Sequence, residues 1–337
     1  MQIVKTNNLI SVVAMSNEDP TYPKENAINK QPMQIAKSSS TSSDILISCG
    51  SIDTVSFFNV SAEQGILQIV DHNSTVPVES GTTISATNPS TFTASGSVDL
   101  SVFSNGDQIA VYGFQNSANN GLFTVSGTPT ATSLTIAETG LVTESAGEAV
   151  KIVRFNASDC VVNQTISFSF CKTYTDYFTG QSILIDKYYL QLTDILTDAT
   201  MRVQITKSTG NPSIGLVFAG IGRSFGVAQY GTSKNIEDNS IYRKSSNGSL
   251  NQVIRPVNFN ATASVSCSRQ EAIGLENLWK YNNSDYKVFV LKPSNDDGFI
   301  SQLLLYGKIE RKPAVTWNRP DRFGYSLNIS SIGGYQS

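Results

Sequence analysis

The side chains best suited to nucleophilic chemistry are scarce in this chain of 337 residues. His72 is the only histidine, and it lies in the turn Val70–Ser74 at the end of an expected strand. A Ser-His-Asp or Cys-His system would have to use this one residue. Its sequence neighbours supply no partner, and the zinc-binding spacings C-x-x-C and H-x-x-x-H are missing. We therefore expect neither a catalytic histidine nor a metal site built on histidine.

Acidic side chains offer two further kinds of chemistry. Glu237–Asn239 and Asp296–Gly298 place carboxylates at turns, as calcium loops do, but neither has the spaced Asp-x-Asp-x-Asn-Gly pattern. Hairpin turns explain both segments. Asp176, Asp186 and Asp194 lie among tyrosines, a composition found in sugar sites where paired carboxylates hydrolyse glycosidic bonds. We expect these carboxylates on sandwich edges and loops, and we expect no enzyme activity, no cofactor and no metal.

Aromatic rings are the remaining candidates, because their faces suit the apolar face of a sugar or the core of an interface. Trp317 stands between Pro313 and Pro320 in a stiff loop, and we expect it to contact another chain or a glycan. Trp279 is expected to pack a helix instead. Three tyrosines are predicted to contribute to the same kind of contact as Trp317, namely Tyr174, Tyr177 and Tyr325.

The composition narrows the class of protein. Charged residues make up 15% of the chain, against about 25% in average soluble domains. Ser, Thr and Asn are abundant, which is typical of β-rich extracellular and virion proteins. The net charge is −3 and the basic residues are scattered, so we expect no nucleic acid partner. No apolar run approaches the about 20 residues that a membrane span needs.

Two further features indicate the compartment. The start Met1–Lys5 lacks the basic and apolar regions of a signal peptide, so we expect synthesis in a cytoplasm. The chain has no C-x-x-C pair, which favours free buried thiols at its cysteines. A disulfide between Cys160 and Cys171 is the alternative, and it would need an oxidising compartment. The cysteines are Cys49, Cys160, Cys171 and Cys267.

Short runs of alternating residues separated by turns predict a small β-domain inserted within another β-domain. The expected insert strands are 108–113, 122–125, 133–136 and 149–153, with turns at 104–107 and 119–121. This unit resembles a module of tailed-bacteriophage tail and other virion proteins. The residues that carry the resemblance are Gly106-Asp107-x-Ile109-x-Val111-x-Gly113, Asn119-Asn120-Gly121-x-Phe123-x-Val125 and Thr143-Glu144-x-Ala146-Gly147.

The segments around the insert predict a β-sandwich. Expected strands are 44–50, 54–60 and 65–70 before the insert, and 188–192, 201–205 and 213–220 after it. The loop Tyr22-Pro23-x-x-Asn26-Ala27, followed by a strand ending at Gly50, resembles the discoidin-like, galactose-binding-type jelly roll. Such sandwiches serve many functions, so the resemblance alone does not establish sugar binding.

The C-terminal part predicts an α+β domain. Residues 269–280 form the best helix candidate, with Ala272, Ile273, Leu275, Leu278 and Trp279 as its apolar positions. Expected strands are 253–259, 263–267, 287–291, 299–309 and 322–329. This order suits a split barrel and resembles the C-terminal part of phage minor tail proteins, which form rings around a tail axis.

The sequence thus predicts a mainly β chain of three domains: a discontinuous jelly-roll sandwich (1–79 plus 155–222), an inserted β-domain (80–154) and a C-terminal α+β domain (223–337). The resemblances imply a structural subunit of a phage tail, distal tail or baseplate. It would be made in the host bacterial cytoplasm and assemble into a homo-oligomeric ring with other tail proteins. Terminal arms, residues 1–18 and 310–337, would reach neighbouring subunits. The alternative is an adhesin or receptor-binding module for host-surface glycans.

Overall fold

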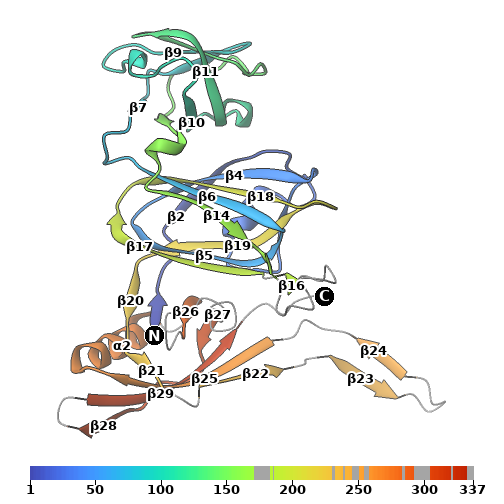
Figure 1. The fold of residues 1–337 in the computed structure, drawn as a ribbon, viewed down its shortest axis with the longest axis vertical. Coiled ribbons are helices and arrows are strands. Elements are labelled where there is room, and N and C mark those ends of the chain that lie inside the picture. Colours follow the sequence, from blue (N-terminus) through green and yellow to red (C-terminus); the bar gives the residue numbers. More distant parts are fainter. Residues whose placement is uncertain are drawn as a thin grey trace.

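The structure is a computed structural model that describes residues 1–170, 183–184, 186–229, 232–237, 240–244, 250–253, 258–282, 285–291, 304–319 and 322–331. It is mainly β and built from antiparallel sheets, as the alternating sequence predicts. Figure 1 shows these sheets stacked as layers, with the insert at the top, a sandwich in the middle and a third layer carrying the helix α2 (Arg269–Asn282) below.

Two sheets form the sandwich. The outer sandwich sheet has the order β14 (Val162–Ser167), β6 (Gln64–Asp71), β18 (Ala199–Thr206), β4 (Ser42–Cys49) and β2 (Leu9–Met15). The inner sandwich sheet has the order β17 (Lys187–Leu196), β5 (Ile52–Ser61), β19 (Ser213–Gly220) and β3 (Ala36–Lys37). The strands expected on both sides of the insert are all present. Both sheets pair strands from before the insert with strands from after it, such as β6 with β18 and β5 with β19, so neither sheet is complete until the chain beyond the insert has been added.

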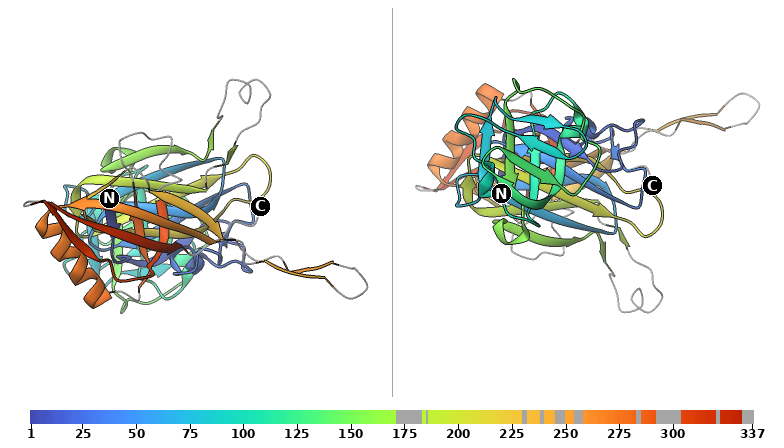
Figure 2. Two further views of the ribbon diagram at one scale, coloured as in Figure 1. Left: turned by 90° about the horizontal axis from the view of Figure 1, so that it is seen from below. Right: turned by 90° about the horizontal axis from the view of Figure 1, so that it is seen from above.

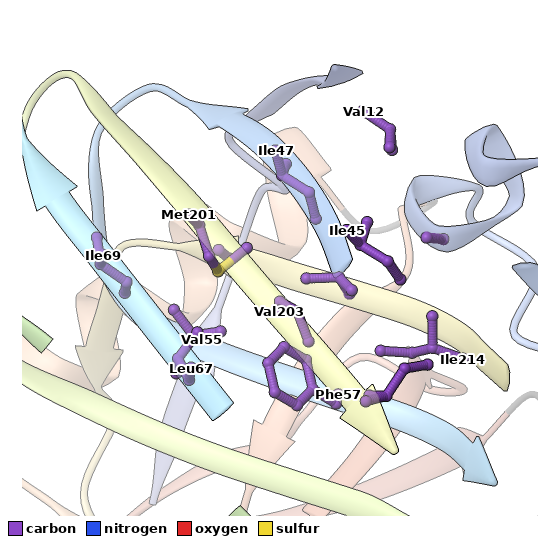
Figure 3. Packing of buried hydrophobic residues seen from close by; sticks show 14 of the residues in the cluster. Val12, Ile45, Ile47, Val55, Phe57, Leu67, Ile69, Met201, Val203 and Ile214 are labelled. Carbon is purple, nitrogen blue, oxygen red and sulfur yellow. The ribbon is translucent and has the colours of Figure 1, made fainter. Parts of the chain in front are cut away.

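One apolar core fills the space between these two sheets. Ile47 and Met201 point inward from the outer sandwich sheet, and Val55 and Phe57 point inward from the inner one (Figure 3). All four side chains have no solvent exposure. Burial of apolar surface contributes about 25 cal/mol per Å², so this core is a main source of the stability of the sandwich.

The insert forms its own sheet and its own core. The insert sheet has the order β7 (Val78–Gly81), β13 (Val150–Arg154), β10 (Gln108–Tyr112), β11 (Gly121–Thr130), β12 (Ser133–Ile136), β9 (Thr91–Thr93) and β8 (Ser85–Thr87). Phe92, Ile109 and Leu134 are among its fully buried side chains. Gly113 follows β10 with a φ of 110°, and a Cβ there would lie 2.3 Å from the carbonyl oxygen of Ala149. Only glycine fits that close approach.

A separate apolar cluster joins the insert to the outer sandwich sheet. Leu46 and Val70 come from β4 and β6, whereas Ala110, Val153 and Phe155 come from the insert side. Phe155 has no solvent exposure, and its backbone N–H donates to the carbonyl oxygen of Gln108 at 2.7 Å. The insert is therefore packed onto the sandwich through apolar contacts.

The remaining layer is the basal sheet. Its order is β20 (Gly222–Ser224), β1 (Gln2–Val4), β26 (Lys287–Val290), β27 (Leu304–Ile309), β29 (Arg322–Ser331), β25 (Asn258–Cys267) and β21 (Val227–Ala228), with β22 (Ser233–Glu237) on β25 and β28 (Val315–Arg319) on β29. The first strand of the chain thus pairs with β26, near the other end of the sequence. Residues 2–4 belong to the basal sheet and not to the sandwich in which the sequence places them.

Both faces of the central basal strands are buried. In β26, Val288 and Val290 contact Phe58 and Phe218 of the inner sandwich sheet, whereas Phe289 faces the layer of α2. This explains why 288–291 is a continuous apolar run, as expected of a buried strand. The helix α2 starts where predicted, because Ser268 and Glu271 form a capping box: the backbone N–H of Ser268 donates to Glu271 Oε2 at 2.9 Å.

The expectation that the terminal segments are free arms is wrong for the residues described. Ile3 is fully buried in the basal sheet, and β2 pairs with β4 along its length. Near the other end, β28 and β29 are also paired strands of the basal sheet. The element that does project is the hairpin of β23 (Ile241–Lys244) and β24 (Leu250–Val253), which extends away from the body in Figures 1 and 2.

Candidate functional site

Trp317 lies on β28, a strand that pairs with β29 alone among the described strands. Its side chain is 72% exposed, the largest exposure among the large apolar side chains of the described residues. The indole stacks on the ring of Phe323, the residue opposite it on β29, with centroids 6.4 Å apart and planes at 14°. The structure therefore presents an exposed aromatic surface at this position, but on a paired strand and not in the loop that the flanking prolines predict.

Tyr325, the second aromatic expected at the surface, is instead a core residue. It is 4% exposed, and its hydroxyl donates to the backbone carbonyl of Phe225. Burial raises the pKa of its hydroxyl. Tyr325 therefore belongs to the core between α2 and the basal sheet and cannot meet an external ligand in this fold. Tyr174 and Tyr177 lie outside the described residues, and Trp279 packs half-buried against the same core.

His72 has partners that the sequence does not reveal. Its Nδ1 donates to Asp198 Oδ1 at 2.9 Å, and its Nε2 accepts from the Thr200 hydroxyl at 2.9 Å. From the insert, Lys151 Nζ donates to Asp198 Oδ2 at 2.8 Å, and the Tyr112 hydroxyl lies 3.3 Å from Thr200 Oγ1. These residues belong to separate strands and loops, so no spacing motif marks them. Together they form a polar network between the insert and the sandwich.

The hydrogen-bonded chain from Asp198 through His72 to Thr200 has the same kinds of groups as a hydrolase triad, but the Thr200 hydroxyl has a structural position and not a catalytic one. Thr200 has no solvent exposure, so a substrate cannot reach its Oγ1. Burial lowers the pKa of His72, and this effect exceeds the opposing attraction of Asp198. Burial alone would raise the pKa of Asp198, but hydrogen bonds from Lys151 and His72 hold it below the usual range. The network is therefore a neutral histidine beside an ion pair that orients the insert.

Acidification through the histidine range is expected to destabilise the protein through His72. The unfolded chain binds a proton at a pKa near 6.5, whereas the folded chain binds it only at lower pH. The contribution of neutral His72 to the free energy of unfolding is therefore fully present above about pH 6.5. It is lost as the pH drops below that value, by at most about 1.4 kcal/mol per pH unit. Urea unfolding between pH 7.5 and 5 measures this slope.

The control for that measurement is His72→Gln, which removes the only histidine of the chain. The variant is expected to lose the contribution of His72 to the slope between pH 7.5 and 5 and so to have a smaller slope than wild type. The buried N-terminal amine of Met1, whose pKa is also lowered by burial, adds the same slope to both proteins, whereas Glu144 and Glu271, with lowered pKa values, titrate at lower pH. Equal slopes for both proteins would contradict the assignment.

A groove runs along one side of the sandwich, between the edge strands β14 and β17. We call it the edge groove, and its volume is about 560 Å³. It is lined by Asp71, Val161, Val162, Asn163, Gln164, Leu190, Gln191, Leu192, Thr193, Asp194 and Leu196. Among the apolar side chains that line the groove, Val161 is 51% exposed, and Leu190 and Leu192 are half-buried. The groove thus combines apolar surface with two carboxylates.

The acidic and sulfur-containing candidates are placed as follows. Asp194 lines the edge groove, whereas Asp176, Asp238 and Asp296–Gly298 lie outside the described residues. Within the described ranges, no group of three His, Cys, Asp or Glu side chains is arranged to share a metal ion. Cys49, Cys160 and Cys267 are free thiols, and Cys171 is not among the residues described. Burial raises the pKa of the Cys160 thiol to about 11.

Comparison with known proteins gives no relative: no protein-family model matches the chain, and no curated protein matches it significantly. Within the part of the chain that the structure describes, no helix has the length and apolar character needed to cross a membrane.

Proposed function

We propose that this chain is a structural subunit of a tailed-phage virion, located at the distal tail or baseplate, that assembles into a ring and docks neighbouring tail proteins. The observation that carries the proposal is the exposed Trp317–Phe323 stack on the edge strand β28. Exposed aromatic residues are enriched at the cores of interfaces, where a partner removes them from water. The virion-type residue pattern of the insert supports the same class of protein.

The proposal includes the fold types of two of the layers. The sandwich, with the insert between β6 and β14, is a jelly roll of the discoidin-like type, and the basal sheet with α2 is a split-barrel-like ring domain. Support comes from the shared core of the two sandwich sheets and from the helix that covers one face of the basal sheet. A ring needs two different surfaces on each subunit that fit each other and close by rotation.

Replacing Trp317 with alanine is expected to weaken self-association of the purified protein by at least about 2 kcal/mol, the range of a buried hot-spot aromatic. The same change is expected to lower the free energy of unfolding by no more than about 1 kcal/mol, because only the stacking on Phe323 is lost. Sedimentation velocity over a range of concentrations measures the association. Val227→Ala, at another exposed apolar residue, is the matched control.

A wild-type chain that stays monomeric at high concentration would contradict ring assembly. The location in the virion has a separate test, in which the chain is fitted into an electron-microscopy map of intact phage particles. We expect density for this fold around the axis at the tail tip. A particle map without such density would contradict the proposal.

The second candidate function is glycan binding, and the same Trp317 ring favours it, because a flat exposed indole can stack on the apolar face of a sugar. A glycan array with wild type and Trp317→Ala separates the two functions. Binding that is lost in the variant while association is unchanged supports a receptor-binding module. An array without signal, combined with loss of association in the variant, supports the structural subunit.

A further inference from the structure

The projecting hairpin of β23 and β24 has no partner strand within the described part of its own chain. The two strands pair only with each other and form a separate two-stranded sheet. Figures 1 and 2 show it leaving the basal layer and pointing away from the sandwich. An isolated two-stranded hairpin is marginally stable in water. We therefore expect contacts with another molecule to stabilise this hairpin.

One face of this hairpin is both apolar and basic. Ile241 lies directly opposite Val253, so their side chains share a face, and Arg243 lies on the same face two residues along. Val253 is 55% exposed, and Arg243 is also exposed. The sequence from 241 to 253 contains two basic residues, Arg243 and Lys244, and no acidic residue. This face therefore fits a surface that is apolar and acidic.

The edge groove has these properties. Val161, which is 51% exposed, and the half-buried Leu192 provide apolar surface, and Asp71 and Asp194 provide carboxylates, whereas its lining contains no basic side chain. Its walls β14 and β17 are the terminal strands of the two sandwich sheets, so each has one side without a neighbouring strand in its sheet. Such edges accept an added strand through backbone hydrogen bonds.

We propose that the projecting hairpin of one copy docks in the edge groove of the next copy. In this contact Ile241 and Val253 cover Val161 and Leu192, and Arg243 pairs with Asp194. The hairpin and the groove are different surfaces, so each copy donates one and offers the other, and the contact repeats around a closed ring. The inference rests on the proposed ring assembly and names one contact that contributes to it beside the Trp317 surface.

Charge reversal tests the pairing. Arg243→Glu and Asp194→Lys are each expected to weaken self-association by at least about tenfold, because like charges then face each other. The combined variant is expected to recover most of the affinity, since the pair is restored with opposite orientation. Lys308→Glu, at an exposed position on β27, is the matched control and leaves association unchanged. Circular dichroism confirms that the variants are folded.

Cysteine crosslinking tests the geometry. A mixture of Val253→Cys and Thr193→Cys chains is expected to form a disulfide-linked dimer on mild oxidation, because Thr193 is an exposed residue of the groove lining, whereas neither variant does so alone. The single variants also control for the native thiols, of which Cys49 and Cys267 are buried.

The outcomes separate this contact from the ring itself. A wild-type chain that remains monomeric overturns the proposed function and, with it, this contact. A wild-type chain that associates, with no effect of either charge reversal and no crosslinked dimer, overturns the hairpin contact alone. Recovery in the combined variant together with the crosslink supports both.

Discussion

Replacing Phe57 with alanine is expected to lower the free energy of unfolding by about 3–5 kcal/mol. The ring has no solvent exposure and stacks on Tyr188 with centroids 5.3 Å apart, so the change removes apolar contacts and leaves a cavity between the two sandwich sheets. The rigid sheets on both sides cannot collapse into that space. Equilibrium unfolding in urea, followed by tryptophan fluorescence and circular dichroism, measures the loss.

The matched control for this substitution is Ile10→Ala in β2. Ile10 is 65% exposed, so its truncation is expected to change stability by no more than about 0.5 kcal/mol. A loss below about 1 kcal/mol for Phe57→Ala would mean that the core between the sandwich sheets is not packed as described.

Replacing Phe155 with alanine is expected to cost about 3–5 kcal/mol and to loosen the insert from the sandwich. The ring is fully buried in the cluster that joins the two units, beside Val70 and Val153. Hydrogen exchange is expected to rise at residues 72–80 and 154–160, where the chain passes between the units. Peptide-resolved exchange, with the unfolding free energy measured in parallel, provides the readout.

Phe92→Ala is the control for the junction. Phe92 is fully buried within the insert core and has a similar expected cost, but it does not belong to the joining cluster. Its truncation should raise exchange inside the insert and leave the junction protected. The same exchange pattern for both variants would contradict a separate joining cluster.

Much of the fold could be predicted from local patterns. Buried and exposed or half-exposed positions alternate in β12, whereas β4, β6 and β10 contain runs of buried residues because both of their faces are covered. Turn residues bound all four strands, so their existence and approximate limits follow from the sequence. The helix α2 also follows from its apolar spacing and its capping residues. Ile273 is the exception, since it is 49% exposed and lies off the stripe formed by Ala272, Leu275 and Leu278.

Long-range pairing could not be predicted, because periodicity shows which face of a strand is buried but not which strand lies beside it. Gln2–Val4 reads as an extended terminal segment, yet it lies between β20 and β26. The His72 network was missed for the same reason, since its members meet only after the strands have paired. Tyr325 did carry a signal, because it alternates with Leu327 and Ile329, two positions buried in the same core.

The chain enters and leaves the insert at almost the same point. Val78 is paired with Val153, and the backbone N–H of Arg154 donates to the carbonyl oxygen of Pro77 at 3.0 Å. Excising the segment and ligating its two ends would thus require only a tight turn, and a foreign domain with adjacent termini would fit the same position. Removing the insert would expose Leu46 and Val70 of the sandwich. The sandwich would tolerate the exchange if the new domain covered these two side chains or if they were replaced by polar residues. The insert can therefore be exchanged for another domain without changing how the strands of the sandwich are connected.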